Sequence, residues 1–493
     1  MKKTIALICV VCLLLPCLIG CGKQPQETVT AGTYISIKEV EEKLAIIYND
    51  TLIVTEYAYE RDYQLMLSRN GDYGLCETSE NALLYIHDGI VEKLTDRVGT
   101  YRMNADGTSV LYQEMEGGSL QLYQKATGKT ETISNGFIAD CVLSPDGQTV
   151  AYLTSPSEWE SDYRLFVQKI GGERKELPLE SQRGNRLISI NDQADLLYLL
   201  AGNKVISMDG EGKTTLVRAK VTEKFFFSNA DHTQLMFYAD GLGTCLSTQG
   251  QLSVTLTEQW LWPIEPTGVH FVSNGVEPER LPFVFGVLQM TCHVPDLSGY
   301  LLGEQLSYLG SSGYSFWLPN AEGVYTQIAE SQIYNSQQSS YYLDPQGRFL
   351  YYTKMGEQST EVYYVNLETG AAPVQVVEKV SYFAVRRDGT GVYNIYNGLY
   401  FHSVAEGAEP QRLVDTDTGT YCYVSENNRV YISRHVGPKK SLFVLNEEGT
   451  KAELLLENVD VVVQEDCGMI YIRAGEDHYV IRAGELIKLQ IKR

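Results

Sequence analysis

A tight turn followed by an apolar strand recurs about every forty residues along this chain, and this recurrence limits the fold more than any other feature of the sequence. The clearest copy covers residues 139–179, where a short apolar strand meets the turn SPDG at 144–147. The proline presets φ, the aspartate can bond its own backbone and Gly147 accepts a positive φ, so the chain reverses there at little cost. Three more strand-like segments follow, and the copy predicts one four-stranded antiparallel blade.

The last residue of each turn marks a copy of this unit. Successive markers are 34 to 46 residues apart, which is close to the length of a four-stranded propeller blade. The segments that flank Gly275 and Gly313 fit the pattern least well, and a weaker copy at 41–54 brings the number to twelve. The markers are Gly71, Gly107, Gly147, Gln193, His232, Gly275, Gly313, Gly347, Gly389, Asn428 and Gly468.

The predicted fold class is all-β, a β-propeller. The 34 tyrosines and 43 glycines favour strands and turns, and no long stretch keeps a helical period. Because one ring commonly closes with four to eight blades, twelve units predict two tandem six-bladed propellers of four-stranded antiparallel blades, at residues 34–257 and 258–493. The boundary is expected near Pro263 and Pro266, which resist strand pairing. A seven-plus-five division and one large irregular propeller are the alternatives.

The segment SPDGQTVAYLT at 144–154 resembles the β-propeller repeat of TolB-like periplasmic proteins, which is WD-repeat-like and also occurs beneath the hydrolase domain of prolyl-oligopeptidase-like enzymes. As a repeat pattern the resemblance covers most of the chain. It implies blade architecture and brings no catalytic residue, ligand or cofactor with it. The residues that match one by one are Ser144, Pro145, Asp146, Gly147, Val150, Ala151 and Tyr152.

Residues 1–20 have the pattern of a lipoprotein signal peptide. Lys2 and Lys3 precede an apolar run that is too short to span a bilayer comfortably, and the run ends in Leu-Ile-Gly before Cys21. This ending resembles the bacterial lipobox, which implies cleavage before Cys21 and its lipidation. Residues 21–33 then form a lipidated spacer, and the protein is expected on the extracytoplasmic face of the cell membrane. An ordinary secretory peptide and an uncleaved anchor are the alternatives.

The chain is strongly acidic. Its net charge of −22 falls to −24 if cleavage removes Lys2 and Lys3, because residues 1–20 contain no acid. A nucleic acid partner would require a basic patch that neutralises phosphates. No such patch is evident in the sequence, and we predict no binding to nucleic acid.

The cysteine and histidine patterns indicate neither a metal site nor a cofactor. After residue 21 no CxxC or HExxH motif occurs, and the segment 415–419, DTDTG, has only the beginning of a calcium loop. Free thiols are favoured because Cys141 and Cys422 lie in apolar strands. The cysteines that remain after cleavage and lipidation are Cys76, Cys141, Cys245, Cys292, Cys422 and Cys467.

The sequence assigns no catalytic residue and no ligand-binding residue. A propeller-bearing peptidase would need a GxSxG elbow, whose spacing the GSSG segment at 310–313 lacks. We therefore expect a binding or scaffold module for a protein, peptide or glycan. The alternatives are a propeller glycosidase or lyase with carboxylates in a central channel, and a purely structural part of an envelope complex. Trp159, in a polar loop, is as suited to ligand contact as to packing, whereas Trp260 and Trp262 favour packing.

Overall fold

The computed structural model describes residues 33–493 with internal gaps. The gaps are 61–62, 64, 69–70, 116–117, 157–161, 181–183, 219–220, 229–231, 233, 240–267, 274–278, 281–287, 291–301, 309–310, 320–324, 335–340, 344–347, 356–358, 417–418, 437–438 and 465–468. The described strands all belong to one compact unit, Thr33–Arg493.

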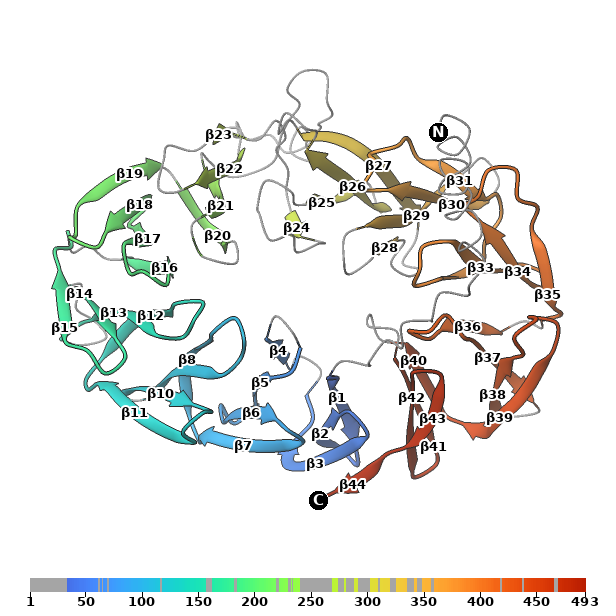
Figure 1. Cartoon of the computed structure of the whole chain (residues 1–493), viewed down its shortest axis with the longest axis horizontal. Coiled ribbons are helices and arrows are strands. Elements are labelled where there is room, and N and C mark those ends of the chain that lie inside the picture. The colour runs from blue at the N-terminus through green and yellow to red at the C-terminus, as the bar shows by residue number, and fades with distance from the viewer. Residues whose placement is uncertain are drawn as a thin grey trace, which may run out of the picture. The chain divides into compact units, whose positions relative to one another are not determined.

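Every regular element in the described residues is a β-strand, and the strands form eleven sheets of four, which confirms the all-β propeller class (Figure 1). We number the sheets in chain order. Sheets 1 to 4 contain β1 Ile35–Val40, β2 Lys43–Tyr48, β3 Thr51–Ala58 and β44 Gln490–Lys492; β4 Leu65–Leu67, β5 Gly74–Glu77, β6 Leu83–His87 and β7 Ile90–Thr95; β8 Val98–Met103, β9 Ser109–Glu114, β10 Leu120–Gln124 and β11 Lys129–Ser134; and β12 Ile138–Leu143, β13 Thr149–Thr154, β14 Arg164–Lys169 and β15 Arg174–Leu177.

Sheets 5 to 8 contain β16 Arg186–Ile190, β17 Leu196–Ala201, β18 Lys204–Asp209 and β19 Thr214–Arg218; β20 Val221–Ser228, β21 Gln234–Ala239, β22 Gly268–Ser273 and β23 Glu279–Arg280; β24 Leu288–Met290, β25 Leu302–Tyr308, β26 Ser311–Pro319 and β27 Tyr325–Tyr334; and β28 Tyr341–Leu343, β29 Phe349–Met355, β30 Thr360–Asn366 and β31 Val374–Val377. Sheets 9 to 11 contain β32 Tyr382–Val385, β33 Gly391–Ile395, β34 Leu399–Ser403 and β35 Gln411–Val414; β36 Tyr421–Val424, β37 Val430–Val436, β38 Lys439–Leu445 and β39 Ala452–Val459; and β40 Val461–Gln464, β41 Ile470–Ala474, β42 Asp477–Arg482 and β43 Glu485–Lys488.

The core lies between the faces of successive sheets. Strand β13 is buried at five consecutive positions, as expected of a strand that is covered on both faces, whereas three of the four residues of the last strand β15 are exposed. Leu153 of sheet 4 and Leu199 of sheet 5 belong to one cluster of buried apolar side chains. Similar clusters join sheets 1 to 2, 2 to 3, 3 to 4, 8 to 9, 9 to 10 and 10 to 11.

The SPDG turn forms as its sequence predicts. The Gly147 N–H donates to the Ser144 carbonyl at 2.9 Å, and the Asp146 carboxylate accepts the Gln148 N–H at 2.9 Å. Gly147 has a φ of +71°, and a Cβ there would lie 2.8 Å from the Oγ of Ser109 in sheet 3. Glycine is therefore required both by the backbone conformation and by the contact between neighbouring sheets.

The first and last sheets pack against each other. Strand β44 pairs in parallel with β3, with Leu52 opposite Ile491, and Ile47 of sheet 1 shares an apolar cluster with Tyr471 and Val480 of sheet 11. This contact is the one expected of a single large irregular propeller. The predicted boundary at 257/258 lies outside the described residues, and the division into two six-bladed rings is not confirmed and stays a prediction.

The described residues contain eleven blade sheets, whereas the sequence predicts twelve units. One of the predicted turn markers does not lie in a turn. Gly313 lies inside β26, where it pairs with Leu306 and Gln332, because the Ser-Ser-Gly run continues a long strand instead of turning. Gly275 lies outside the described residues. The weaker copy at 41–54 is a true unit, since its turn at Glu41 and Glu42 joins β1 to β2, the first two strands of sheet 1.

Candidate functional site

Several residues singled out in the sequence lie outside the described part of the chain. They include the predicted lipidation site Cys21, as well as Trp159, Trp260 and Trp262. Lipidation at Cys21 and ligand contact at Trp159 therefore stay predictions. Within the described part of the chain, no helix has the length and apolarity needed to cross a membrane.

The three described cysteines are buried free thiols, as the sequence predicts. Burial raises the pKa of Cys76 and of Cys141 to about 12, and it also raises the pKa of Cys422. A thiol with so high a pKa is a packing group and not a nucleophile at neutral pH. The other three, Cys245, Cys292 and Cys467, lie outside the described residues.

The acidic segment at 415–419 is engaged in local contacts where it is described. Asp415 forms an ion pair with Arg412, and Gly419 has the positive φ of a turn residue. Asp417 lies outside the described residues. Among the residues that are described, no group of three or more histidine, cysteine, aspartate or glutamate side chains is placed to hold a metal ion.

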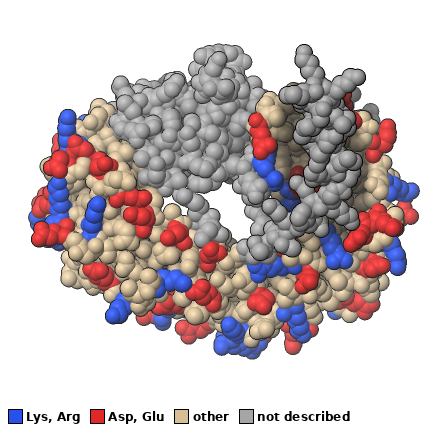
Figure 2. Space-filling view, viewed as in Figure 1, with Lys and Arg blue, Asp and Glu red and all other residues tan. Residues whose placement is uncertain are grey.

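Charged side chains of both signs are interspersed over the described part of the face in Figure 2. Exposed ion pairs among the described residues include Arg164 with Glu176 and Lys488 with Asp477. Isolated exposed pairs of this kind contribute little to stability.

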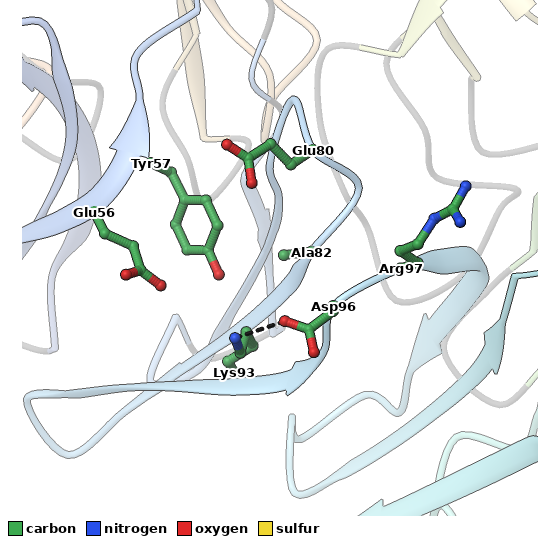
Figure 3. Close-up of a pocket in the computed structure, with 7 residues that line it drawn as sticks. All are labelled: Glu56, Tyr57, Glu80, Ala82, Lys93, Asp96 and Arg97. Carbon is green, nitrogen blue, oxygen red and sulfur yellow. Dashed lines mark ion pairs between the residues drawn. The ribbon is translucent and has the colours of Figure 1, made fainter.

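A pocket of about 530 Å³ lies where parts of sheets 1 and 2 and the connection to sheet 3 come together (Figure 3). Sheet 1 supplies Glu56 and Tyr57 from the end of β3. Sheet 2 supplies side chains from the β5–β6 turn and from β7, and the rest come from the β7–β8 connection. The lining residues are Glu56, Tyr57, Glu80, Ala82, Lys93, Asp96 and Arg97.

A bulge in sheet 1 places Glu56 and Tyr57 at the pocket. The register between β2 and β3 shifts, so that Lys43 pairs with Ala58 while Ala45 pairs with Val54. Thr55 lies in the extra loop of chain, and its hydroxyl donates to the Leu44 carbonyl at 2.8 Å and accepts the Tyr57 N–H at 3.3 Å. Bulges bend a strand and redirect its side chains, and the fixed Thr55 hydroxyl holds this one in place.

A tight turn between β5 and β6 carries Glu80. The Asn81 N–H donates to the Thr78 carbonyl at 2.8 Å, the Ala82 N–H donates to the Thr78 hydroxyl at 3.0 Å, and Asn81 has a φ of +65°. The Asn81 carbonyl accepts the Val98 N–H at 2.8 Å, which joins the turn to the first strand of sheet 3. Glu80 is therefore presented by a fixed backbone.

The pocket lining contains more negatively than positively charged side chains. Three carboxylates, those of Glu56, Glu80 and Asp96, accompany the two cations. Lys93 Nζ lies 2.6 Å from an Asp96 carboxylate oxygen, and this hydrogen bond raises the pKa of Lys93. The Arg97 side chain points away from the Tyr57 ring (Figure 3).

Tyr57 is a buried member of the pocket, with 8% of its surface exposed, and Ala82 is also buried. Burial raises the pKa of Tyr57, and the nearby carboxylates add to this effect while Lys93 opposes it. Among the described residues, no group forms a hydrogen bond with its hydroxyl, which points between Glu56 and Lys93 in Figure 3. The pocket therefore contains a protonated phenol whose hydrogen-bonding capacity is open to a ligand.

A second polar feature, the buried Asp140 on the first strand of sheet 4, has a structural role. Its carboxylate accepts the Leu187 N–H of sheet 5 at 2.8 Å and the Cys141 N–H at 2.9 Å, and Arg102 Nη2 of sheet 3 lies 3.9 Å away. Burial raises the pKa of Asp140. These contacts fasten three successive sheets to one another.

Sequence reasoning identified neither the pocket nor Asp140. The pocket residues come from three separate connections and share no motif, and their assembly depends on the bulge in β3 and on the packing of sheet 1 against sheet 2. Asp140 carries one signal in the sequence, since it is a carboxylate inside an otherwise apolar strand.

Comparisons with known proteins give no family for this chain. No family model matches it, and no curated protein matches it. Among solved structures, it is similar to dipeptidyl peptidase 4 of Porphyromonas gingivalis, at 10% identity and a TM-score of 0.37, over 86% of this chain and 65% of that chain. This chain therefore spans less than two thirds of the length of that peptidase.

Two further similarities are to propeller proteins. A TolB from Agrobacterium tumefaciens, described as putative, is 13% identical with a TM-score of 0.31, over 52% of this chain and 92% of that chain. The β-propeller domain of the Trilobed protease of Pyrococcus furiosus is 11% identical with a TM-score of 0.32, over 65% of this chain and 98% of that chain. The propeller architecture of this chain is established by its own strand pairing and sheet packing.

Proposed function

We propose that this protein is a lipoprotein tethered through Cys21 to the extracytoplasmic face of the cell membrane, where its propeller acts as a binding or scaffold module for a protein, peptide or glycan. The tether is supported by the charged start, the apolar run and the lipobox-like Leu-Ile-Gly-Cys ending at Cys21. Two acyl chains would anchor the protein stably. The spacer at 21–33 would keep the propeller close to the membrane.

The observation that carries the binding role is the chemical state of the groups in the pocket. Tyr57 has a raised pKa and stays protonated at neutral pH, and Lys93 has a raised pKa and stays charged. A general acid or base works best with a pKa near the operating pH. Both groups instead keep a single protonation state at neutral pH, which suits recognition of a ligand better than proton transfer.

The alternative function, a glycosidase or lyase, needs a pair of carboxylates placed around the substrate. In a propeller such acids would lie on the first strands, which contact one another from sheet to sheet, as β12 does with β8 and β16. Among first strands whose side chains are described, carboxylates occur at Glu39 and Asp140. The Asp140 carboxylate is already occupied by two backbone N–H groups. This arrangement favours binding over catalysis.

Metabolic labelling with palmitate tests the tether. The wild-type protein should incorporate label and sediment with membranes, and Cys21→Ala should abolish both properties. Cys17→Ala is the matched control, because Cys17 lies in the segment that cleavage would remove, and it should behave as wild type. Label retained in the Cys21→Ala variant, or absent from the wild type, would contradict lipidation at Cys21.

Retrieval of partners tests the binding role. The soluble body, residues 22–493, is immobilised and exposed to envelope proteins, envelope peptides and cell-wall glycans at micromolar concentration. A saturable partner that is released by excess free body is the expected result. Failure of all three classes to bind would count against a binding or scaffold module.

A further inference from the structure

We propose that the pocket beside Tyr57 binds a cationic group, a primary ammonium or a guanidinium, carried by its ligand. This inference deepens the binding role proposed above and rests on it. It names the chemical class that this site recognises and the residues that would contact the cation.

The balance of charge selects a cation. Lys93 and Asp96 neutralise each other through their 2.6 Å contact, and Arg97 points away from Tyr57. The carboxylates of Glu56 and Glu80 then remain on two sides of the Tyr57 ring, as Figure 3 shows. Because three carboxylates face two cations in its lining, the cavity attracts a positive group and repels a negative one.

Tyr57 adds two further means of recognition. Its ring presents the negative face of an aromatic quadrupole, and cations bind within about 6 Å of such a ring. Its hydroxyl forms no hydrogen bond with the described residues and can accept one from an N–H donor of the ligand. An ammonium or guanidinium supplies such donors and the positive charge together.

Lys93 sets the orientation of the ligand. Its ammonium lies on the hydroxyl side of Tyr57, where it repels a second cation (Figure 3). The positive group of the ligand is therefore directed toward Glu56 and Glu80, and it reaches the Tyr57 hydroxyl from the Glu56 side, away from the ion pair. Removal of Lys93 should consequently strengthen binding of a cation, which is the opposite of the effect expected from removal of either glutamate.

Titration monitored by ligand-detected NMR tests the proposal on the intact soluble body. The probes are N-acetyl-lysine amide and N-acetyl-arginine amide, and the neutral control of similar shape is N-acetyl-norleucine amide. The two cationic probes should bind at about millimolar concentration and the control at least about tenfold more weakly. Binding should weaken as NaCl is raised from 20 to 500 mM, because salt screens exposed charges.

Two sources of the cation are distinguished by two further probes. Spermidine represents a free small amine, and a tripeptide with a central lysine and blocked ends represents a peptide side chain. Tighter binding of the tripeptide than of N-acetyl-lysine amide assigns the site to peptides. Tighter binding of spermidine assigns it to small amines.

Substitutions in the pocket provide the decisive comparison. Glu56→Gln and Glu80→Gln should each weaken binding of the lysine probe by about three- to tenfold, and Tyr57→Phe by about two- to threefold. Lys93→Met should tighten it by about two- to threefold. Glu176→Gln is the matched control. Glu176 is an exposed ion-pair partner of Arg164 in sheet 4, and this substitution removes one negative charge at a position far from the pocket residues in the sequence. This control should leave affinity unchanged.

The outcomes distinguish failure of the cation site from failure of the proposed binding function. Equal affinity for the charged and neutral probes, equal weakening by Glu56→Gln and Glu176→Gln, or weaker binding in Lys93→Met would overturn the cation site. Thermal melting of every variant excludes loss of fold as the cause. If palmitate labelling and partner retrieval succeed while the cationic probes fail, the proposed function stands and only this inference falls.

Discussion

The hydroxyl of Tyr351 in sheet 8 donates a hydrogen bond of 2.8 Å to the carbonyl of Gly389, the turn residue of sheet 9. The same relationship joins sheet 2 to sheet 3, where Tyr85 donates to Gly107 at 2.8 Å. Both tyrosines are fully buried, and burial raises their pKa values. The repeat is therefore connected from sheet to sheet by a polar contact as well as by apolar packing.

Tyr351→Phe should destabilise the protein by about 1–2 kcal/mol. The change removes the hydroxyl and leaves the buried Gly389 carbonyl without this donor, and an unsatisfied buried acceptor is costly. Urea denaturation followed by tyrosine fluorescence measures the shift in midpoint. Tyr152→Phe is the control, because the buried Tyr152 hydroxyl has no hydrogen-bond partner among the described residues, so its removal should be neutral or stabilising. A midpoint that is the same for Tyr351→Phe and the wild type would contradict a stabilising role for this contact.

Asp140 should make stability fall as pH rises through the weakly acidic range. Its pKa is raised in the folded state, so the folded protein binds the Asp140 proton more tightly than the unfolded chain does. Protonation therefore favours the folded state, and this contribution is lost between the pKa of an ordinary aspartate and the raised value. The unfolding free energy of the wild type minus that of Asp140→Asn should accordingly fall from pH 4 to pH 7, because asparagine does not titrate. A rise in this signed difference over the interval would show that the carboxylate is stabilised, and not destabilised, by its surroundings.

Cys76 and Cys141 should resist alkylation in the folded protein. With a pKa of about 12, only about one thiol in ten thousand is ionised at pH 8, and both side chains are fully buried. Iodoacetamide labelling followed by peptide mass spectrometry should find these two cysteines unmodified in the native protein and modified after denaturation in urea. Rapid native labelling of Cys141 would mean that β12 opens to solvent.

Deletion of residues 490–493 should lower the melting temperature by about 3–6 °C. It removes β44, including the hydrogen bond of 3.0 Å from the Gln490 N–H to the Asp50 carbonyl, and it exposes the edge of β3. Arg493→Gln is the control, because the ion pair of Arg493 with Glu41 is exposed and should contribute little. Equal melting temperatures for the deletion and the wild type would mean that β44 does not hold sheet 1 together.

The blade pattern is predictable from sequence wherever a turn residue must take an unusual backbone conformation. The markers Gly107, Gly147 and Gly389 lie between the first and second strands of their sheets, with φ values of +85°, +71° and +73°. Gly313 misleads because a serine-glycine run can also continue a strand when both neighbouring strands pair with it. Local composition therefore identifies turns that need glycine and does not exclude glycine from strands.

The candidate site is not predictable from sequence by the same reasoning. Glu56, Glu80 and Lys93 belong to different elements, and none lies in a motif. Their proximity depends on a bulge of a few residues in β3 and on the register of sheet 1 against sheet 2. Both are long-range consequences of packing.

The parallel pairing of β44 with β3 has a consequence for how the molecule assembles. The two strands lie at opposite ends of the sequence. Strand β3 is therefore synthesised early, and the edge that pairs with β44 has no partner until nearly all other strands have been synthesised. Throughout that interval a nascent chain carries an open strand edge, which is a template for pairing with another molecule. Proteolytic trimming close to Gln490 should therefore yield chains that self-associate, even though ten of the eleven sheets have all their own strands.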